Sequence, residues 1–515
     1  MSSSTPQLGG KRKLGVLSVA FLVVAASAPL TVVAGGVTTA LAVTGSTGIP
    51  FGYIVLTVAL LLFAVGYAAM SRFVTNAGAF YAYISQGLSR ALGVGSSLIA
   101  LVSYNMMQIG IYGLFGFFLS NFVSAKFGVS TPWYLWVLIC LVIVAILGMN
   151  RVDLSAKVLA ILVALEFVVV IIFDITSFAV APQGVTTAPL SFGSFWGPAT
   201  GSVLAFGIAA FMGFESGALY GEESKNPKTT VARATYLAVI VIGVFYALSS
   251  WAMIVGIGES KVAEAAVAGP DLVFGFLSEH VGVIISDIAQ VLFITSLFAA
   301  LVSFHNAVAR YNFSLGREGV LPRGLAKVSK GGAPIVGSLV QSIIAIVVII
   351  GFIIGESTTA GALVVPDVFG PGLSLNLFPL FTLFTWLTNA GAMGLVLLMS
   401  LVSIAVIGYF VKDQHGVNVW SRLIAPIIAT LALGTIFFLI FSNFTLLLTT
   451  DPKTPVTWSD PLAWVLPIIV IVPGVIGLIY GLVLKSSNPK VYDQIGHGIA
   501  EDHTAGGLGE AARGI

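Results

Sequence analysis

The chain has 515 residues, of which 57% are hydrophobic and only 9% are charged. Soluble globular proteins have roughly 45–50% apolar and about 25% charged residues, and a chain in water does not hide this much apolar surface. The composition excludes a soluble enzyme, a nucleic-acid-binding domain and a disordered chain, and the net charge of +2 indicates no polyanionic partner. The single cysteine, Cys140, excludes a disulfide framework and a cysteine-based metal site.

Apolar runs long enough to cross a membrane recur along the whole chain. A hydrocarbon core of roughly 30 Å needs about 20 apolar residues in a helix. We therefore expect an all-α membrane protein with twelve transmembrane helices. The predicted spans are 14–42, 50–74, 92–124, 131–149, 154–179, 198–221, 230–257, 281–313, 334–356, 376–411, 421–448 and 462–485.

The charged residues support this topology and orient it. With the N-terminus in the cytoplasm, all but three of the 23 Lys and Arg residues fall on the cytoplasmic side, as the positive-inside rule requires. The three exceptions are Lys126, Lys261 and Lys453. Both termini are predicted to be cytoplasmic, in a plasma or inner membrane, and the polar ends, 1–10 and 486–515, are expected to be poorly ordered.

Two of the predicted spans contain residues that interrupt a helix. Pro29 lies in the first span, and Gly213 and Gly217 flank the carboxylate of Glu215 in the sixth. Unwound backbone persists at membrane depth only where it lines a cavity, and matching interruptions in two halves of a chain are typical of a transporter site. The two spans are five apart and cross in opposite directions, as an inverted repeat requires. The alternative is a pair of kinked helices.

Three motifs carry a resemblance to a known family. They are Gly213-Phe214-Glu215-Ser216 followed by Glu222-Glu223-Ser224-Lys225-Asn226-Pro227, the segment Ala77-Gly78-Ala79-Phe80-Tyr81-Ala82-Tyr83, and Asn306 and Arg310 followed by Arg317-Glu318-Gly319-Val320-Leu321-Pro322. In these motifs the chain resembles the amino acid–polyamine–organocation (APC) transporters, over roughly residues 14–485. The resemblance implies secondary transport of an amino acid or related amine by alternating access.

The resemblance also implies the five-plus-five inverted repeat that this family shares with the leucine transporter. The first five-helix repeat would cover 14–179 and the second 198–411, with two additional helices in 421–485. The remaining ends, 1–13 and 486–515, would be cytoplasmic tails.

In that family the first and sixth helices hold the backbone of the substrate. The resemblance implies that the carboxylate meets N–H groups of the first helix and that the amine meets carbonyl groups of the sixth. The implied binding residues are Ser27, Ala28, Pro29, Phe211, Gly213, Phe214 and Ser216. Many members have a Gly-Ser-Gly-like stretch where this chain has Ala26-Ser27-Ala28-Pro29-Leu30, so Gly35 and Gly36 are an alternative location for the carboxylate.

Polar and aromatic side chains on other spans are further candidates. Asn105 and Gln108 in the third span are candidate substrate-binding residues, with hydrogen bonds between helices as the alternative. Hydroxyl groups of the eighth span are candidate sodium ligands, and aromatic side chains of the tenth are candidate gates that could otherwise only pack. These candidates are Thr295, Ser296 and Ser303 for the cation, and Phe384 and Trp386 for the gate. Close helix approach is expected at Gly110, Gly113 and Gly116.

Five ionisable residues lie well within spans, and a charge at the bilayer centre costs roughly 2.5–3.5 kcal/mol. Glu215 and Glu166 are candidates for proton coupling, with a packing hydrogen bond as the alternative for each. Asp174 and Asp287 are expected at solvated extracellular ends, and His305 is expected to be a packed, hydrogen-bonded residue. At the cytoplasmic exit, Glu222 or Glu223 could pair with an arginine, or these loops could simply be solvated.

The sequence favours a secondary transporter that imports an amino acid or small amine, with neutral amino acids preferred and proton symport as the coupling. Amino acid exchange or sodium symport is the alternative within this class, and a non-transporting sensor or a channel of the same fold is the alternative outside it. No nucleophile–base pair or nucleotide-binding loop indicates an enzyme. We expect no cofactor, metal or nucleic acid, and the expected partners are the substrate, a proton or sodium ion, and the lipid bilayer.

Overall fold

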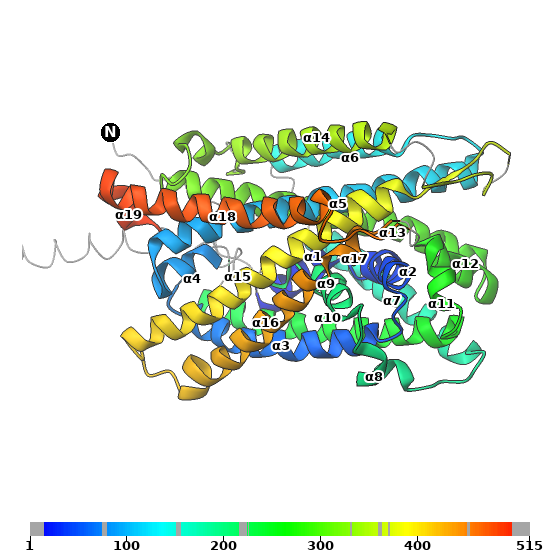
Figure 1. Ribbon diagram of the computed structural model, residues 1–515, viewed down its shortest axis with the longest axis horizontal. Coiled ribbons are helices and arrows are strands. Elements are labelled where there is room, and N and C mark those ends of the chain that lie inside the picture. The colour runs from blue at the N-terminus through cyan, green and yellow to red at the C-terminus, as the bar shows by residue number, and fades with distance from the viewer. Residues whose placement is uncertain are drawn as a thin grey trace, which may run out of the picture.

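The computed structural model describes residues 15–74, 80–150, 156–215, 224, 226–329, 332–358, 363–368, 371–450 and 454–496. Over these ranges the protein is a bundle of helices, most of which run along the long axis of the molecule (Figure 1). Two short strands, β1 (Val364–Val365) and β2 (Leu375–Asn376), pair antiparallel and form the sheet of the described chain. The prediction of an all-helical membrane protein is confirmed.

The predicted spans overlap the longer helical segments. These are α1 (Val16–Ser27), η1 (Thr31–Val37) and α2 (Thr38–Thr44), α3 (Ile49–Met70), α5 (Arg90–Phe127), α6 (Trp133–Asn150), α7 (Ala156–Val180), α9 (Thr200–Phe211), α10 (Pro227–Ile257), α13 (Val283–Arg317), α14 (Ile335–Thr358), η7 (Pro379–Phe384) and α15 (Thr385–Lys412), η8 (Trp420–Ile424) and α16 (Ala425–Ser442), and α18 (Pro461–Ser487). The shorter helices are η2 (Ala188–Leu190), α4 (Phe80–Gly87), α8 (Phe192–Phe195), α11 (Val262–Ala265), η5 (Ala266–Ala268), α12 (Asp271–His280), η6 (Arg323–Ala326), α17 (Phe444–Leu448) and α19 (Pro489–Gln494).

Nine helices of the described chain are long and apolar enough to cross a membrane. Three further apolar helices are shorter, namely Thr31–Thr44, Trp133–Met149 and Thr200–Phe211. Two of these three lie beside the predicted interruptions, because a broken span leaves a short helix on each side of the break.

Helix α5 lies in the interior of the bundle, and glycines allow its close contacts. It packs against α13, α15, α18 and η7. A Cβ atom at Gly113 would lie 2.8 Å from the carbonyl oxygen of Pro379, and one at Gly116 would lie 2.8 Å from that of Trp133. At Gly110 a Cβ would lie 3.1 Å from the backbone nitrogen of Thr388. The prediction that these glycines permit close helix approach is confirmed.

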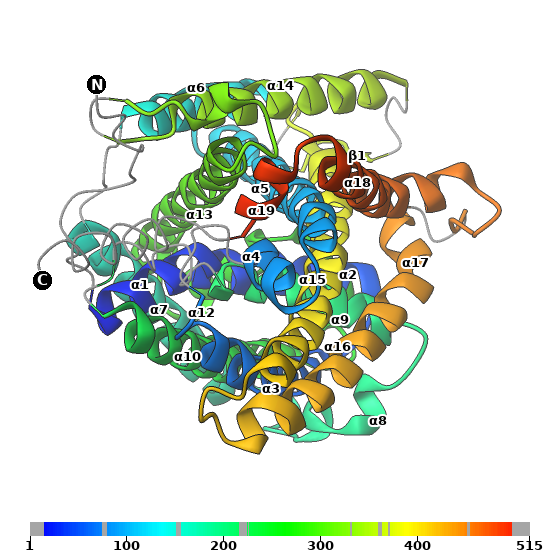
Figure 2. The same cartoon turned by 90° about the vertical axis from the view of Figure 1, so that its left-hand side faces the viewer.

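The two ends of the bundle carry different short helices. Figure 1 shows α4 and α19 at one end and α2, α11 and α12 at the other. Helices α6 and α14 lie side by side along one flank, as both views show (Figures 1 and 2).

Both predicted interruptions are confirmed by the described backbone. Helix α1 ends at Ser27, and Ala28 adopts a left-handed φ of +46°, which is unusual for a residue other than glycine. Helix α9 ends at Phe211, and Gly213 follows with a φ of +106°. Phe214 and Glu215 then form a single tight turn, beyond which the sixth span lies outside the described residues.

Two sequence-based expectations are wrong. Asp174 is only 4% exposed and accepts a hydrogen bond of 2.8 Å from the Ser249 hydroxyl, so it is not a solvated helix end. The C-terminal region from 486 is not uniformly disordered, because α19 is helical and Ile495 is fully buried. By contrast, Asp287 lies at an exposed end as expected, where it pairs with Lys126 at 2.5 Å.

Candidate functional site

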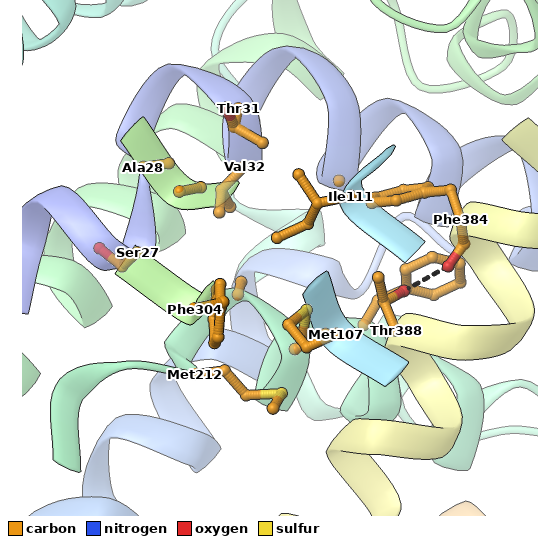
Figure 3. Close-up of a pocket in the computed structure, with 15 residues that line it drawn as sticks. Ser27, Ala28, Thr31, Val32, Met107, Ile111, Met212, Phe304, Phe384 and Thr388 are labelled. Atoms are coloured by element: carbon orange, nitrogen blue, oxygen red, sulfur yellow. Dashed lines mark hydrogen bonds between the residues drawn. The ribbon is translucent and has the colours of Figure 1, made fainter. Parts of the chain in front are cut away.

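A small cavity of about 50 Å³ lies beside the two interruptions (Figure 3). Its walls come from α1, η1, α5, α9, α13, η7 and α15 and are mostly apolar. Ser27, Thr31 and Thr388 supply the hydroxyl groups, and no described charged side chain lines the cavity. Apolar wall residues include Ala28, Val32, Met107, Ile111, Phe206, Met212, Phe304 and Phe384.

The first interruption exposes backbone groups that side chains of other helices satisfy. The carbonyl group of Ser27 ends α1 and accepts a hydrogen bond of 3.1 Å from the hydroxyl of Tyr246 on α10. Beyond Pro29, the N–H group of Leu30 donates to the Glu166 carboxylate on α7 over 3.2 Å. A buried helix end without such partners would be costly, so these contacts allow the break to persist within the membrane.

Two hydroxyl groups connect Glu166 to the cavity. The Ser296 hydroxyl donates to the Glu166 carboxylate over 2.8 Å, and the Thr31 hydroxyl donates to Ser296 over 3.0 Å. Thr31 itself lines the cavity. The arrangement forms a continuous hydrogen-bonded path from the cavity to a carboxylate that is only 2% exposed.

The second interruption is tied to a cluster of aromatic residues. The N–H group of Gly213 donates to the Glu215 carboxylate over 3.1 Å, and the Tyr104 hydroxyl donates to the other carboxylate oxygen. The Tyr67 hydroxyl donates to the Glu215 carbonyl group over 3.2 Å. Glu215 is 1% exposed and is not part of the cavity wall, so its contacts hold the broken segment against α3 and α5.

The structure brings together some of the predicted site residues and not others. Ser27, Ala28 and Phe384 line the cavity, and Phe211 lies beside it, in ring contact with Tyr246 at 6.5 Å. Pro29, Gly213 and Phe214 lie at the breaks but not in the wall, and Ser216, Glu222 and Glu223 lie outside the described residues.

The predicted residues of the third span turn away from the cavity. The Asn105 side chain donates to the Leu101 carbonyl group of its own helix over 2.7 Å. Gln108 accepts a hydrogen bond from Gln341 on α14 and lies 3.4 Å from His305 Nδ1. His305 also contacts the Ser338 hydroxyl at 2.6 Å, which confirms the expectation of a packed, hydrogen-bonded histidine.

Only some of the predicted cation ligands and only one of the two predicted gate residues lie at the cavity or next to it. Ser296 contacts Glu166, but the Thr295 hydroxyl donates to the Leu292 carbonyl group of its own helix over 2.9 Å. Ser303 is two turns further along α13 and is not part of the cavity wall. Of the gate residues, Trp386 contacts Phe352 with a ring distance of 6.2 Å instead of facing the cavity.

Sequence reasoning missed several residues that form the site. Thr31 directly follows the stretch Ala26–Leu30 but is not among the predicted site residues, and Tyr246 is one of several polar residues in the seventh span. A buried tyrosine hydroxyl usually requires a hydrogen-bond partner, which was the available signal for Tyr246. Met107, Ile111, Met212 and Phe304 carry no signal that distinguishes them from lipid-facing or core residues.

An apolar helical bundle, broken at two points beside a buried cavity, defines a multi-pass membrane protein of the transporter class. The sequence profile of a family described as amino acid permease matches residues 14–473. The chain belongs to this amino acid permease family, in agreement with the APC motifs, and is a transporter and not an enzyme.

Three relatives illustrate the range of named substrates. The chain is 25% identical to the branched-chain amino acid permease BcaP of Lactococcus lactis over 324 residues, which are 58% of this chain and 68% of the relative. It is 26% identical to BcaP of Bacillus subtilis over 308 residues, or 56% and 63% of the two chains. It is 29% identical to the aromatic amino acid transport protein AroP of Escherichia coli K12 over 164 residues, or 31% and 34%. The alignments therefore cover about two thirds of the branched-chain relatives and one third of the aromatic one.

Proposed function

We propose that the protein imports neutral amino acids with an apolar side chain, of the branched-chain type, by proton-coupled alternating access. The observation that carries the substrate class is the cavity wall, in which no described side chain is charged. Burying a cationic or anionic side chain against Met107, Ile111 and Phe304 would leave its charge unpaired, which is strongly unfavourable. The names of the branched-chain relatives agree with this preference.

The two breaks would hold the backbone of the substrate. Its carboxylate would bind at the Ser27–Leu30 segment and its ammonium group at carbonyl groups of the Phe211–Ser216 segment. Ser27, Ala28 and Met212 already line the cavity, so either segment is within reach of a bound amino acid. The N–H of Leu30 is the donor that such a carboxylate would share with Glu166.

Glu166 is the carboxyl group that we propose for coupling. While ionised, it accepts the hydrogen bonds of Leu30 and Ser296; a proton that enters through Thr31 and Ser296 would weaken its hold on the Leu30 N–H. The released N–H would then be free to bind the carboxylate of the substrate. In this way the proton and the substrate would enter together. Glu215, which contacts the second break but not the cavity, is the other candidate.

We further propose the twelve-span, five-plus-five arrangement, with both termini in the cytoplasm of a cell that carries the protein in its plasma membrane. The long and short apolar helices of the described chain support the number of spans. The distribution of Lys and Arg supports the orientation.

Transport by the purified protein in proteoliposomes tests this function. Labelled leucine, isoleucine and valine should exchange by counterflow, whereas arginine and glutamate should not. A proton gradient directed into the vesicles, with the outside more acidic, should drive leucine accumulation, and a sodium gradient alone should not. Transport of arginine at a rate similar to that of leucine would refute the proposed substrate class. Accumulation driven by a sodium gradient would show that the coupling ion is sodium and not the proton.

The variants Glu166→Gln and Glu215→Gln separate the two coupling candidates. Glu166→Gln should abolish accumulation driven by a pH gradient and retain counterflow, because glutamine fills the same space but exchanges no proton. Glu215→Gln is the matched comparison at the second break. Uphill uptake that persists in Glu166→Gln but is lost in Glu215→Gln would move the coupling role to Glu215.

A further inference from the structure

We propose that the segment Pro489–Gly496, called the latch segment here, is an autoinhibitory latch that holds one end of the carrier closed. This inference rests on the transport function proposed above. The latch segment consists of α19 and the two residues after it, and it lies at the same end of the molecule as α4 (Figure 1). The end-on view in Figure 2 places α19 over the middle of the bundle, beside α4, α5 and α18.

The latch segment is fastened to the region between the second and third spans. The Gln86 side chain at the end of α4 donates to the Gly496 carbonyl group over 2.7 Å. Arg90 at the start of α5 pairs with Asp493 at 2.7 Å and lies over the ring of Tyr492, 5.6 Å from its centre. These contacts hold α19 against the first turn of α5.

The same segment is also fastened to the end of α13. The N–H group of Gly496 donates to the Glu318 carboxylate over 2.9 Å, and Glu318 is only 5% exposed. Val491 packs where Gly319 leaves room for it, and Ile495 is fully buried. One short segment therefore connects the loop that follows the second span with the loop that follows the eighth.

The helix beneath the latch segment packs against the aromatic residues that surround Glu215. On α4, Tyr83 contacts Tyr67 with a ring distance of 5.0 Å, and Tyr81 contacts Tyr311 at 6.3 Å. The Tyr67 hydroxyl in turn donates to the Glu215 carbonyl group at the second break. These tyrosine rings lie between the breaks and this end of the bundle. We therefore expect that a path from the cavity to this end opens only when α4 moves.

A carrier with alternating access must open this end once in each cycle, and the latch segment resists that motion because it joins α4 and α5 to the end of α13. Release of the latch segment should therefore speed up transport. If the segment were purely structural, its removal would have the opposite effect, because the loss would weaken the fold and lower the rate of transport.

Two truncations test the latch. One variant lacks 489–515 and loses the latch segment, and its matched control lacks only 497–515 and retains every contact described above. Opening of a gate often limits the turnover of such proteins, so removal of 489–515 should raise the initial rate of leucine counterflow by about twofold or more relative to the control. The KM for leucine should change little, because the latch segment touches no residue of the cavity wall.

A point substitution tests the same contacts without shortening the chain. Gly496 has a φ of +82°, and a Cβ there would lie 2.7 Å from the Cβ of Ser85, so Gly496→Ala should displace the segment and raise the rate as the truncation does. Gly184→Ala is the matched control, because Gly184 has a φ of +75° with nothing within 4 Å of an added Cβ. Gly184→Ala should leave the rate unchanged.

The outcomes distinguish the latch from the transport function itself. Absence of counterflow in the unmodified protein for every neutral amino acid would refute the proposed function. Normal counterflow in the unmodified protein, with an equal or lower rate in both the 489–515 deletion and Gly496→Ala, would refute the latch alone. The unfolding temperatures of all variants, measured in parallel, should fall only slightly. Faster leucine counterflow despite a lower unfolding temperature is a result that removal of a purely structural tail would not produce.

Discussion

Ala28 is the residue at which the first helix breaks, and its left-handed backbone is strained. An L-residue other than glycine pays roughly 1–2 kcal/mol for this conformation. We expect Ala28→Gly to raise the unfolding temperature of the detergent-purified protein, corresponding to about 1 kcal/mol of stabilisation, because glycine adopts this φ without strain. The loss of one methyl group that faces the cavity should offset only part of this gain.

Ala20→Gly is the control for this prediction. Ala20 is buried in the regular part of α1, where glycine should destabilise the protein by about 0.5–1 kcal/mol. A fall in unfolding temperature for Ala28→Gly as large as for Ala20→Gly would show that the break carries no strain.

Tyr246 positions the first break from a distant helix. Tyr246→Phe keeps the ring but removes the donor to the Ser27 carbonyl group, and an unsatisfied buried acceptor costs about 1–3 kcal/mol. We therefore expect a KM for leucine that is about tenfold higher, with a smaller change in maximal rate.

Tyr53→Phe is the matched control for Tyr246→Phe. The Tyr53 ring packs against that of Tyr246 at 5.5 Å, but its hydroxyl donates to none of the described residues. Equal effects of the two substitutions on KM would indicate that ring packing, and not the hydrogen bond, positions the break.

At this scale the sequence predicts the breaks but not the groups that stabilise them. Pro29 and Gly213 interrupt a helix for local reasons, so their effect could be predicted from neighbouring residues. The partners of the exposed backbone lie far away in the chain, with Leu30 and Glu166 separated by 136 positions and Ser27 and Tyr246 by 219. A single sequence does not show which residues that are so far apart in the chain are in contact in the fold.

At the scale of elements, the contact between α5 and η7 determines the position of one cavity wall. A Cβ at Gly113 would lie 2.8 Å from the Pro379 carbonyl oxygen and 2.9 Å from the Phe384 nitrogen, and these backbone atoms cannot rotate away. Gly113→Ala should destabilise the protein by about 1–3 kcal/mol, as overpacking does. It should also slow leucine transport, because Phe384 lines the cavity.

Gly351→Ala provides the comparison on α14, where nothing lies within 4 Å of an added Cβ. Leucine uptake should remain at the level of the unmodified protein, and the unfolding temperature should stay the same or rise slightly, because alanine in a helix interior is about 0.5–1 kcal/mol more favourable than glycine. If Gly113→Ala were equally harmless, the close contact between α5 and η7 would not exist in the membrane.

The elements that the sequence failed to predict are those that lie outside the apolar runs. Hydropathy identifies segments that can enter lipid, and it predicted the long helices within a few residues. It gives no signal for α4, α12 or α19, which are short and lie at the ends of the bundle. The fold of these helices depends on tertiary contacts such as that of Gln86 with Gly496.

For the whole molecule, the distribution of charge predicts which end faces the cytoplasm. Gly184→Cys in the loop after α7 should react with an impermeant maleimide added outside intact cells. Gly324→Cys in the loop after α13 should react only after the membrane is opened. Both positions have open space around them, and the native Cys140 is only 2% exposed and should react poorly. The reverse pattern of labelling would invert the proposed topology.

In the described structure, peptide groups at both breaks already have internal partners, among them the Leu30 N–H and the Glu215 carbonyl group. In the binding mode proposed above, a cargo molecule would therefore replace two partners of opposite character, an acceptor at Leu30 in the first break and a hydroxyl donor, such as that of Tyr67, at a carbonyl group of the second. A zwitterion offers both at a fixed separation, whereas a simple fatty acid or an alkyl amine of the same size offers only one and would leave the other peptide group bare. In the proposed binding mode, selection for the common head of all α-amino acids would thus be built into the resting protein, and the apolar walls would distinguish one amino acid from another.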